Sequence, residues 1–186
     1  MDDDWEWEEW YVESEDSGGP VLGPIPAHLY SVYEDGPFTL CSICSEPLST
    51  DEGDKLYEVK KVYRGRRVIF ECAICHRCGH KLLAEYSKES LNAIRGFFEE
   101  HFKPGLSLLE CHFCEAERDP DTADASVMAV CVGDRLVQQP VCMCDGCNER
   151  VNGCLSKKTQ DVNGDFIRDY FPGIPAEWQD SPMVSF

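Results

Sequence analysis

Residues 41–44 read CSIC and residues 75–78 read CHRC, and the same arrangement returns as CHFC at residues 111–114 and CDGC at residues 144–147. Between the two pairs lie 30 residues in the first half of the chain and 29 in the second. A Cys-x2-Cys turn points both thiolates to one side, at a separation that suits two corners of a tetrahedron. Two such turns complete a shell of four sulfurs. The sequence therefore predicts two metal sites of four thiolates each.

The predicted metal is zinc, with two ions per chain. A complete four-thiolate shell leaves no coordination position for water or substrate, which is typical of a structural site. Iron is the alternative, because rubredoxin-like sites also use four thiolates at similar spacing. The predicted ligands are Cys41, Cys44, Cys75 and Cys78 in the first half, and Cys111, Cys114, Cys144 and Cys147 in the second.

The similarity of the two halves continues beyond the cysteines. Residues 86–90, YSKES, align with residues 155–159, LSKKT, and Phe102 aligns with Phe171 at the same offset of 69 positions. A Pro-Gly follows each of these phenylalanines at once or after one residue. We interpret this pattern as an internal duplication of a unit of about 65 residues. It predicts a first module at residues 37–105 and a second at residues 106–186, after an acidic, Pro/Gly-rich tail and linker at residues 1–36.

Local patterns predict the elements between the cysteine pairs. Residues 56–59 and 67–70 are rich in β-formers around a polar turn at 63–66, which indicates a β-hairpin. Residues 127–132 and 135–137 predict the same shape in the second half.

Helical patterns follow each second cysteine pair. Apolar residues recur at spacings of three to five over residues 83–102, which is typical of one face of a helix. Residues 151–170 repeat the pattern less regularly, and Asn163-Gly164 is expected to interrupt this second helical region.

The order of a cysteine knuckle, a β-hairpin and a Cys-x2-Cys that opens a helix resembles the treble-clef zinc-finger group. The resemblance covers about 130 residues and implies a fold and a metal, but no single function, because the group serves ribosomal, ubiquitin-pathway, nucleic-acid-binding and protein-binding proteins alike. The predicted fold class is α+β, with two small zinc modules side by side.

Other cysteines and histidines compete for the ligand positions. Cys72 and Cys142 each lie 28 positions after the first pair of their half, but Cys142-x-Cys144 lacks the two-residue spacer. We therefore prefer the later pairs as ligands and expect Cys131 and Cys154 to be small buried core residues. The remaining alternatives to a thiolate ligand are the three histidines beside the predicted ligands, His76, His80 and His112.

The charge is strongly negative and uneven. The chain has a formal net charge of −18, and residues 1–16 hold nine acids, three Trp and one Tyr without a single Lys or Arg. Such a balance repels phosphate backbones and argues against general nucleic-acid binding. No apolar run approaches the roughly 20 residues of a membrane span. With no signal-peptide pattern at the start and twelve cysteines, we expect a soluble protein of the reducing cytoplasm.

One basic segment stands out against this background. Five of the eight residues 60–67, KKVYRGRR, are Lys or Arg, at the predicted turn of the first hairpin. We consider this segment a binding surface for an acidic partner, covered in the free protein by residues 2–16, or a solvated turn. It also supports the alternative of a nucleic-acid-binding factor.

The sequence favours an interaction role over catalysis. It contains none of the common hydrolase, zinc-protease or phosphate-loop motifs, and thiolates bound to zinc do not act as free nucleophiles. The predicted function is that of a structural zinc protein that binds another protein as an adaptor or regulator. A zinc-dependent or redox enzyme is the second alternative.

Overall fold

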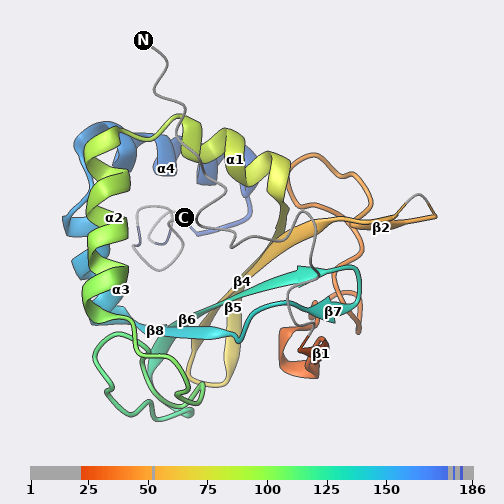
Figure 1. Cartoon of the computed structure of the whole chain (residues 1–186), viewed down its shortest axis with the longest axis horizontal. Helices are drawn as coiled ribbons and strands as arrows, with labels where there is room; N and C mark the ends of the chain where they lie inside the picture. The colour runs from red at the N-terminus through yellow and green to blue at the C-terminus, as the bar shows by residue number, and fades with distance from the viewer. Residues whose placement is uncertain (1–21, 52, 176–177, 179–180, 182–186) are drawn as a thin grey trace.

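The fold was analysed in a computed structural model that describes residues 22–51, 53–175, 178 and 181. Within that part the chain is mixed α+β, with small antiparallel sheets and four α-helices (Figure 1). The strands are β1 (Gly23–Pro24), β2 (Ser49–Thr50), β3 (Gly53–Asp54), β4 (Leu56–Arg64), β5 (Arg67–Cys75), β6 (Asp124–Val132), β7 (Arg135–Leu136) and β8 (Val141–Cys144). The helices are α1 (His76–Ala84), α2 (Lys88–His101), α3 (Asp145–Gly153) and α4 (Lys157–Tyr170), with a 3-10 turn at Ala27–Leu29.

A single antiparallel sheet joins the two halves of the chain. Its strand order is β1-β7-β6-β4-β5, and β8 pairs with β6 as well. The seam between the halves is the pairing of β4 with β6, which runs from Leu56 opposite Val132 to Arg64 opposite Asp124. Lys60 and Met128 face each other at its centre. The sequence predicts two modules side by side, but the structure gives them one sheet.

The core follows the same seam. One cluster of buried side chains contains Val59 and Val62 of β4, Val127 and Ala129 of β6, and Ile167 of α4, so both halves contribute to it. Burial of apolar surface on this scale stabilises a fold by roughly 25 cal/mol per Å² removed from water. Neither half could expose its face of this core without losing that contribution, so the halves stabilise each other.

The predicted first hairpin is confirmed. Strands β4 and β5 pair from Tyr57 opposite Cys75 to Arg64 opposite Arg67, with one register shift after Val62, beside the two-residue turn Gly65-Arg66. Gly65 has a φ of 56°, and a Cβ atom there would lie 2.3 Å from the carbonyl oxygen of Asp121. The turn thus requires glycine both for its left-handed backbone and for the close approach of the other half.

The predicted second hairpin is confirmed as well, with a difference in its continuation. Strand β6 turns at Gly133-Asp134 into β7, but β7 is only two residues long. The strand that leads into the last cysteine pair is β8, which pairs with β6 from Ala125–Cys144 to Met128–Val141. The sequence does not predict β8, because its four residues show no clear alternation of apolar and polar side chains and therefore give little periodic signal.

Each helical region consists of two helices instead of one. The first breaks between Ala84 and Lys88 and the second between Gly153 and Lys157. The expected interruption at Asn163-Gly164 is wrong, because α4 runs through both residues. Asn163 is buried, and its side-chain oxygen accepts a hydrogen bond from the hydroxyl of Tyr86, which explains a polar residue inside this helix.

The N-caps of α2 and α4 contact each other across the two halves. The side chain of Ser87 accepts from the Ser90 amide and that of Ser156 from the Thr159 amide, as N-cap residues do. The two serine hydroxyls lie 2.8 Å apart. In addition, the Ser156 amide donates to the Ser90 hydroxyl at 2.8 Å, and the Ser87 amide donates to the Thr159 hydroxyl at 3.0 Å. Each helix start therefore satisfies backbone groups of the other.

The segment before the first cysteine pair packs against the sheet. Gly23-Pro24 pairs with β7, and Ile25 and Leu29 are buried. Lys61 of β4 forms a buried ion pair with Glu71 at 3.1 Å and donates a hydrogen bond to the carbonyl oxygen of Tyr30. Part of the segment expected to be a linker thus contributes to the core, while residues 1–21 lie outside the described part of the chain.

We predict that the two N-cap serines are energetically coupled. Replacing Ser87 or Ser156 by Ala should each lower the free energy of unfolding by about 1 kcal/mol. The double variant should lose less free energy of unfolding than the sum of the two single losses, by about 0.5 kcal/mol or more. The reason is that the first substitution already removes the contact that the two serines share. Urea unfolding measures all three values. As a control, Ser87→Ala combined with Ser107→Ala should be additive; additive losses for Ser87 and Ser156 would contradict the contact.

Candidate metal centres

The structure brings the eight predicted ligands together in two groups of four. Within each group all the sulfur atoms lie within 4.8 Å of one another. The first group consists of Cys41, Cys44, Cys75 and Cys78, and the second of Cys111, Cys114, Cys144 and Cys147. In the described part of the chain, no other Cys, His, Asp or Glu belongs to either group.

The first cysteine pair of each half lies in a tight loop with the same hydrogen bonds. The Cys41 amide donates to the carbonyl oxygen of Glu46, and the Cys111 amide donates to that of Ala116, each at 2.9 Å. Ser45 and Glu115, which follow the second cysteine of each loop, have φ values of 56° and 60°. These left-handed residues turn the chain back, so that both sulfurs point to one side.

The second pair of each half lies where a strand becomes a helix. Cys75 ends β5 and Cys78 lies in the first turn of α1, while Cys144 ends β8 and Cys147 lies in the first turn of α3. A helix start exposes unpaired backbone N–H groups and a partial positive charge, which favours thiolates nearby. The fold thus places two sulfurs of each group in a favourable field.

Backbone amides tie each loop to its strand. The Cys75 amide donates to the sulfur of Cys41, and the Cys144 amide donates to the sulfur of Cys111, both at 3.4 Å. A sulfur that accepts such hydrogen bonds is stabilised in its ionised form. The same pair of contacts in both halves fixes the loops at the same distance from their helices.

A second set of hydrogen bonds supports this arrangement. Ser42 exchanges two hydrogen bonds with Ala73 of β5, one of 2.8 Å through its amide and one of 3.0 Å through its hydroxyl. In the second half His112 does the same with Cys142 of β8: its amide donates at 2.9 Å, and its Nδ1 accepts from the Cys142 amide at 3.2 Å. His112 therefore anchors the loop instead of entering the sulfur group.

The separations between sulfurs fit a tetrahedral zinc ion. A tetrahedron with Zn–S bonds of about 2.3 Å has edges of about 3.8 Å. The sulfurs of Cys44 and Cys75 are 3.9 Å apart, and those of Cys114 and Cys144 are 3.7 Å apart. The four cysteines in each group are free of disulfides. Both groups could therefore hold a metal ion without rearrangement of the backbone.

The pKa values of the cysteines also favour a bound cation. Burial raises the pKa of Cys75, Cys78 and Cys147, and it raises the pKa of Cys144 to about 11. In Cys44 and Cys111 hydrogen bonds outweigh burial and lower the pKa to about 7. Four such thiols would not all ionise next to one another at neutral pH, and a bound divalent cation reverses this preference.

The other cysteines do not enter the groups. Cys72, Cys131 and Cys142 are buried, which agrees with a packing role, and burial raises the pKa of Cys131 to about 12 and that of Cys142 to about 11. The expectation that Cys154 is a buried core residue is wrong, because this residue is exposed at the end of α3. His76 and His80 are exposed on α1.

The segment at residues 60–67 does not form a continuous basic surface. Lys60 and Lys61 are only 3% and 2% exposed. Arg64 pairs with Asp124 at 3.6 Å and Arg66 pairs with Asp121, both acids from the second half. Burial on β4 thus removes Lys60 and Lys61 from the predicted tip, whereas Arg64, Arg66 and Arg67 are exposed. Residues 2–16, proposed as its cover, lie outside the described part of the chain.

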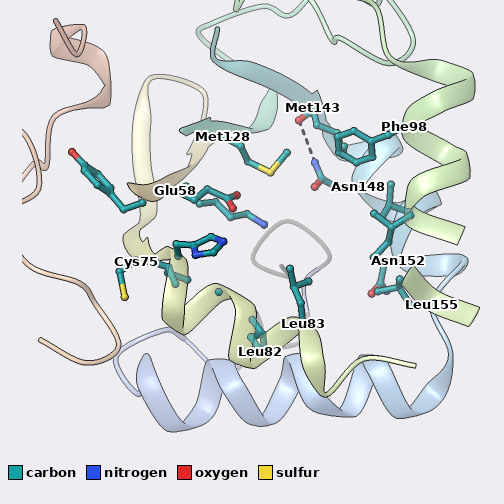
Figure 2. A pocket seen from close by; sticks show the side chains of 17 residues that line it. Glu58, Cys75, Leu82, Leu83, Phe98, Met128, Met143, Asn148, Asn152 and Leu155 are labelled. Carbon is teal, nitrogen blue, oxygen red and sulfur yellow. Dashed lines mark hydrogen bonds between the residues drawn. The ribbon is translucent and has the colours of Figure 1, made fainter. Parts of the chain in front are cut away.

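A cavity of about 180 Å³ lies over the centre of the seam, between the helices of the two halves (Figure 2). Lys60 and Met128 are at its floor, where β4 meets β6. Many of its other lining side chains are apolar residues of α1, α2, α3 and the segment that follows α3: Leu82, Leu83, Ile94, Phe98, Val151 and Leu155.

Glu58 and Lys60 are two of the ionisable residues that line this cavity. Burial lowers the pKa of Lys60 to about 8, and burial raises that of Glu58, with the Lys60 charge acting in the opposite direction. Asn148 lines the same cavity and donates to the carbonyl oxygens of Met143 and Cys144 at 3.2 and 3.0 Å. The cavity therefore combines a large apolar wall with a few polar groups, as ligand and peptide sites do. No sequence pattern predicts it, because its walls come together only through the seam.

None of the helices in the described residues is both long and apolar enough to cross a bilayer.

We predict that the cysteines differ sharply in what their loss does. Cys78→Ser and Cys147→Ser should each lose one metal ion per chain, because a closed shell of four thiolates then lacks a ligand. Cys154→Ser should keep both ions and change stability by less than about 0.5 kcal/mol. Cys131→Ser should also keep both ions but lose about 1–3 kcal/mol through a buried hydroxyl. Elemental analysis and urea unfolding measure these effects, and equal metal loss in all four variants would refute the ligand assignment.

No family model, curated protein or solved structure matches this chain. The two sulfur groups and the cavity between the halves are therefore the structural evidence for its function.

Proposed function

We propose that this chain is a structural zinc-binding protein that acts as an adaptor or regulator through contact with another protein. The observation that carries the proposal is the pair of four-cysteine groups, each with its sulfurs within 4.8 Å. A shell of four thiolates holds zinc firmly and leaves it no open position for substrate or water. Zinc in such a site fixes loops and helices and performs no redox chemistry.

The same observations support a treble-clef-like reading of each half. A cysteine loop, a β-hairpin and a helix that begins at a cysteine pair occur in the same order twice. The contact of Ser87 with Ser156, 69 positions apart, joins residues that the sequence alignment of the halves makes equivalent. We propose on this basis that the chain arose by duplication of one zinc module, with the seam between β4 and β6 as the interface of the two copies.

The metal would contribute much of the stability. Each sulfur group ties a loop to a strand and a helix, and no disulfide does so in the described residues. Zinc binding to four-ligand sites in small peptides is worth about 10–16 kcal/mol at neutral pH, and this free energy stabilises the folded state when the unfolded chain has no preformed site. Part of it offsets the cost of ordering the loops.

The cavity supports an interaction role. Most of its lining side chains are apolar, and residues of helices from both halves line it. A partner protein that inserts a large apolar side chain would displace water from this surface, which is the usual source of a binding hot spot. Lys60 at the floor would orient a polar or acidic group of the same partner.

We predict two zinc ions per chain in the purified protein. Removal of both by a chelator should abolish cooperative unfolding and the near-ultraviolet circular dichroism signal, because the loops lose their anchors. Restoring zinc should restore both signals. Elemental analysis that gives one ion, none, or iron would contradict this prediction, and so would a chelated protein that keeps its unfolding transition.

We also predict that partner binding depends on the cavity wall. Leu83→Arg places a charge on that wall and should weaken the partner about tenfold or more, which corresponds to about 1.4 kcal/mol. Leu109→Arg makes the same change at a leucine that is 52% exposed and does not line the cavity, and should leave binding unchanged. Co-purification from the native cell identifies the partner, and titration of the purified pair gives the affinities. Equal binding by both variants would refute the cavity as the interface.

A further inference from the structure

The two sulfur groups lie in different electrostatic surroundings. Beside the first group, the Arg77 guanidinium pairs with Glu46 at 2.5 Å, and the Lys55 ammonium pairs with the same carboxylate at 2.9 Å. Hydrogen bonds to Glu46 and to the sulfur of Cys44 raise the pKa of the Arg77 guanidinium. Two cations and one carboxylate thus border the first group, a net positive neighbourhood for four thiolates.

The second group has the opposite balance at the matching positions. Gly146 takes the place of Arg77 between the two cysteines of the helix start, and Ala116 takes the place of Glu46 after the loop. The residues next to these ligands include Glu115 and Asp145, and neither residues 111–117 nor residues 144–147 contain a Lys or Arg. The loop and the helix start of this group are therefore acidic, while the next bases along the chain, Arg118 and Arg150, bond to the Gly65 carbonyl oxygen and to His101.

The second group is also the more accessible one. Cys114 is exposed and Cys144 is half-buried, whereas in the first group only Cys44 is half-buried and the other three cysteines are buried. A reagent from solution therefore reaches the sulfur of Cys114 more easily than any sulfur of the first group.

These differences set the reactivity of metal-bound thiolates. A shell of four thiolates around a divalent cation carries a net charge of about −2. Nearby cations and hydrogen bonds withdraw electron density from the sulfurs and make them weaker nucleophiles, since thiolate reactivity rises with basicity with a Brønsted coefficient of about 0.4–0.5. The first group is protected in this way by Arg77 and Lys55.

We propose that the second group is a thiol-modification site: Cys114 reacts with soft electrophiles before any other ligand cysteine, and the metal of that group is then released. The proposal rests on the proposed zinc function. The sulfur of Cys114 forms a bond to the electrophilic carbon and gives up its bond to the metal. With a maleimide, the neighbouring alkene carbon takes a proton from water. The resulting thioether is neutral, so the metal keeps only three thiolates and binds more weakly.

The test uses the full chain with Cys154→Ser, which removes an exposed thiol outside the groups. Elemental analysis first establishes two zinc ions, so absence of metal would count against the proposed function and not against this inference. One equivalent of N-ethylmaleimide, a neutral reagent, is then added. Released zinc is followed with an indicator dye, and the labelled cysteines are mapped by mass spectrometry.

We expect one zinc ion to leave with the label on Cys114, roughly tenfold faster than any release from the first group. Label that appears first on Cys41, Cys44, Cys75 or Cys78 would overturn the proposal, and so would equal rates at the two groups.

Exchange of the bordering residues tests the electrostatic cause. Gly146→Arg with Ala116→Glu transfers the pair to the second group, where a Cβ at Gly146 meets no atom within 4 Å and Ala116 is exposed. This variant should slow labelling of Cys114 several-fold. The reverse change, Arg77→Gln, removes the positive charge but keeps a polar side chain, and it should accelerate labelling of Cys44. Each variant is used only when it binds two zinc ions, and Lys158→Gln, which removes an exposed positive charge on α4, serves as the control. Rates unchanged by both exchanges would overturn the proposal.

Discussion

Four cysteine sulfurs lie within 4.8 Å of one another at each of two points where a strand becomes a helix, and the rest of the structure depends on this constraint. Four thiols at that distance would resist joint ionisation, because burial raises the pKa of two cysteines in each group. A divalent cation turns the same geometry from unfavourable to strongly favourable. The loop of each half, which hydrogen bonds already tie to its strand, then acquires a defined position against its helix.

The seam between β4 and β6 makes the two metal groups parts of one structure. The pairing runs through nine residues of each strand and buries the core between the halves, and the contact of Ser87 with Ser156 closes the same junction at the helix starts. The cavity over Lys60 and Met128 is a consequence of this seam, since its walls belong to helices of both halves. A surface built in this way exists only while both halves are folded, which suits a protein that acts by contact with a partner.

Much of this could be predicted from the sequence, and the failures have physical causes. The spacing of the cysteines predicts both sulfur groups, and the turn at Gly65-Arg66 predicts the first hairpin, because both signals are local. The seam could not be predicted, since pairing between strands some 68 positions apart leaves no local trace. The sequence predicts Lys60 and Lys61 at a charged tip, but both side chains are buried on β4. The sequence predicts a break in the helix at Asn163, but this residue lies within α4 and forms a buried hydrogen bond with Tyr86.

The central claim is that each group binds zinc through four thiolates and nothing else. X-ray absorption spectroscopy at the zinc edge of the purified, metal-loaded protein tests it most directly, because it measures the identity and distance of the ligand atoms. The account predicts a single shell of four sulfurs at about 2.3 Å, averaged over both sites. A shell that contains nitrogen or oxygen at about 2.0–2.1 Å would contradict it, because a histidine or a water molecule would then occupy a position that the structure assigns to a cysteine.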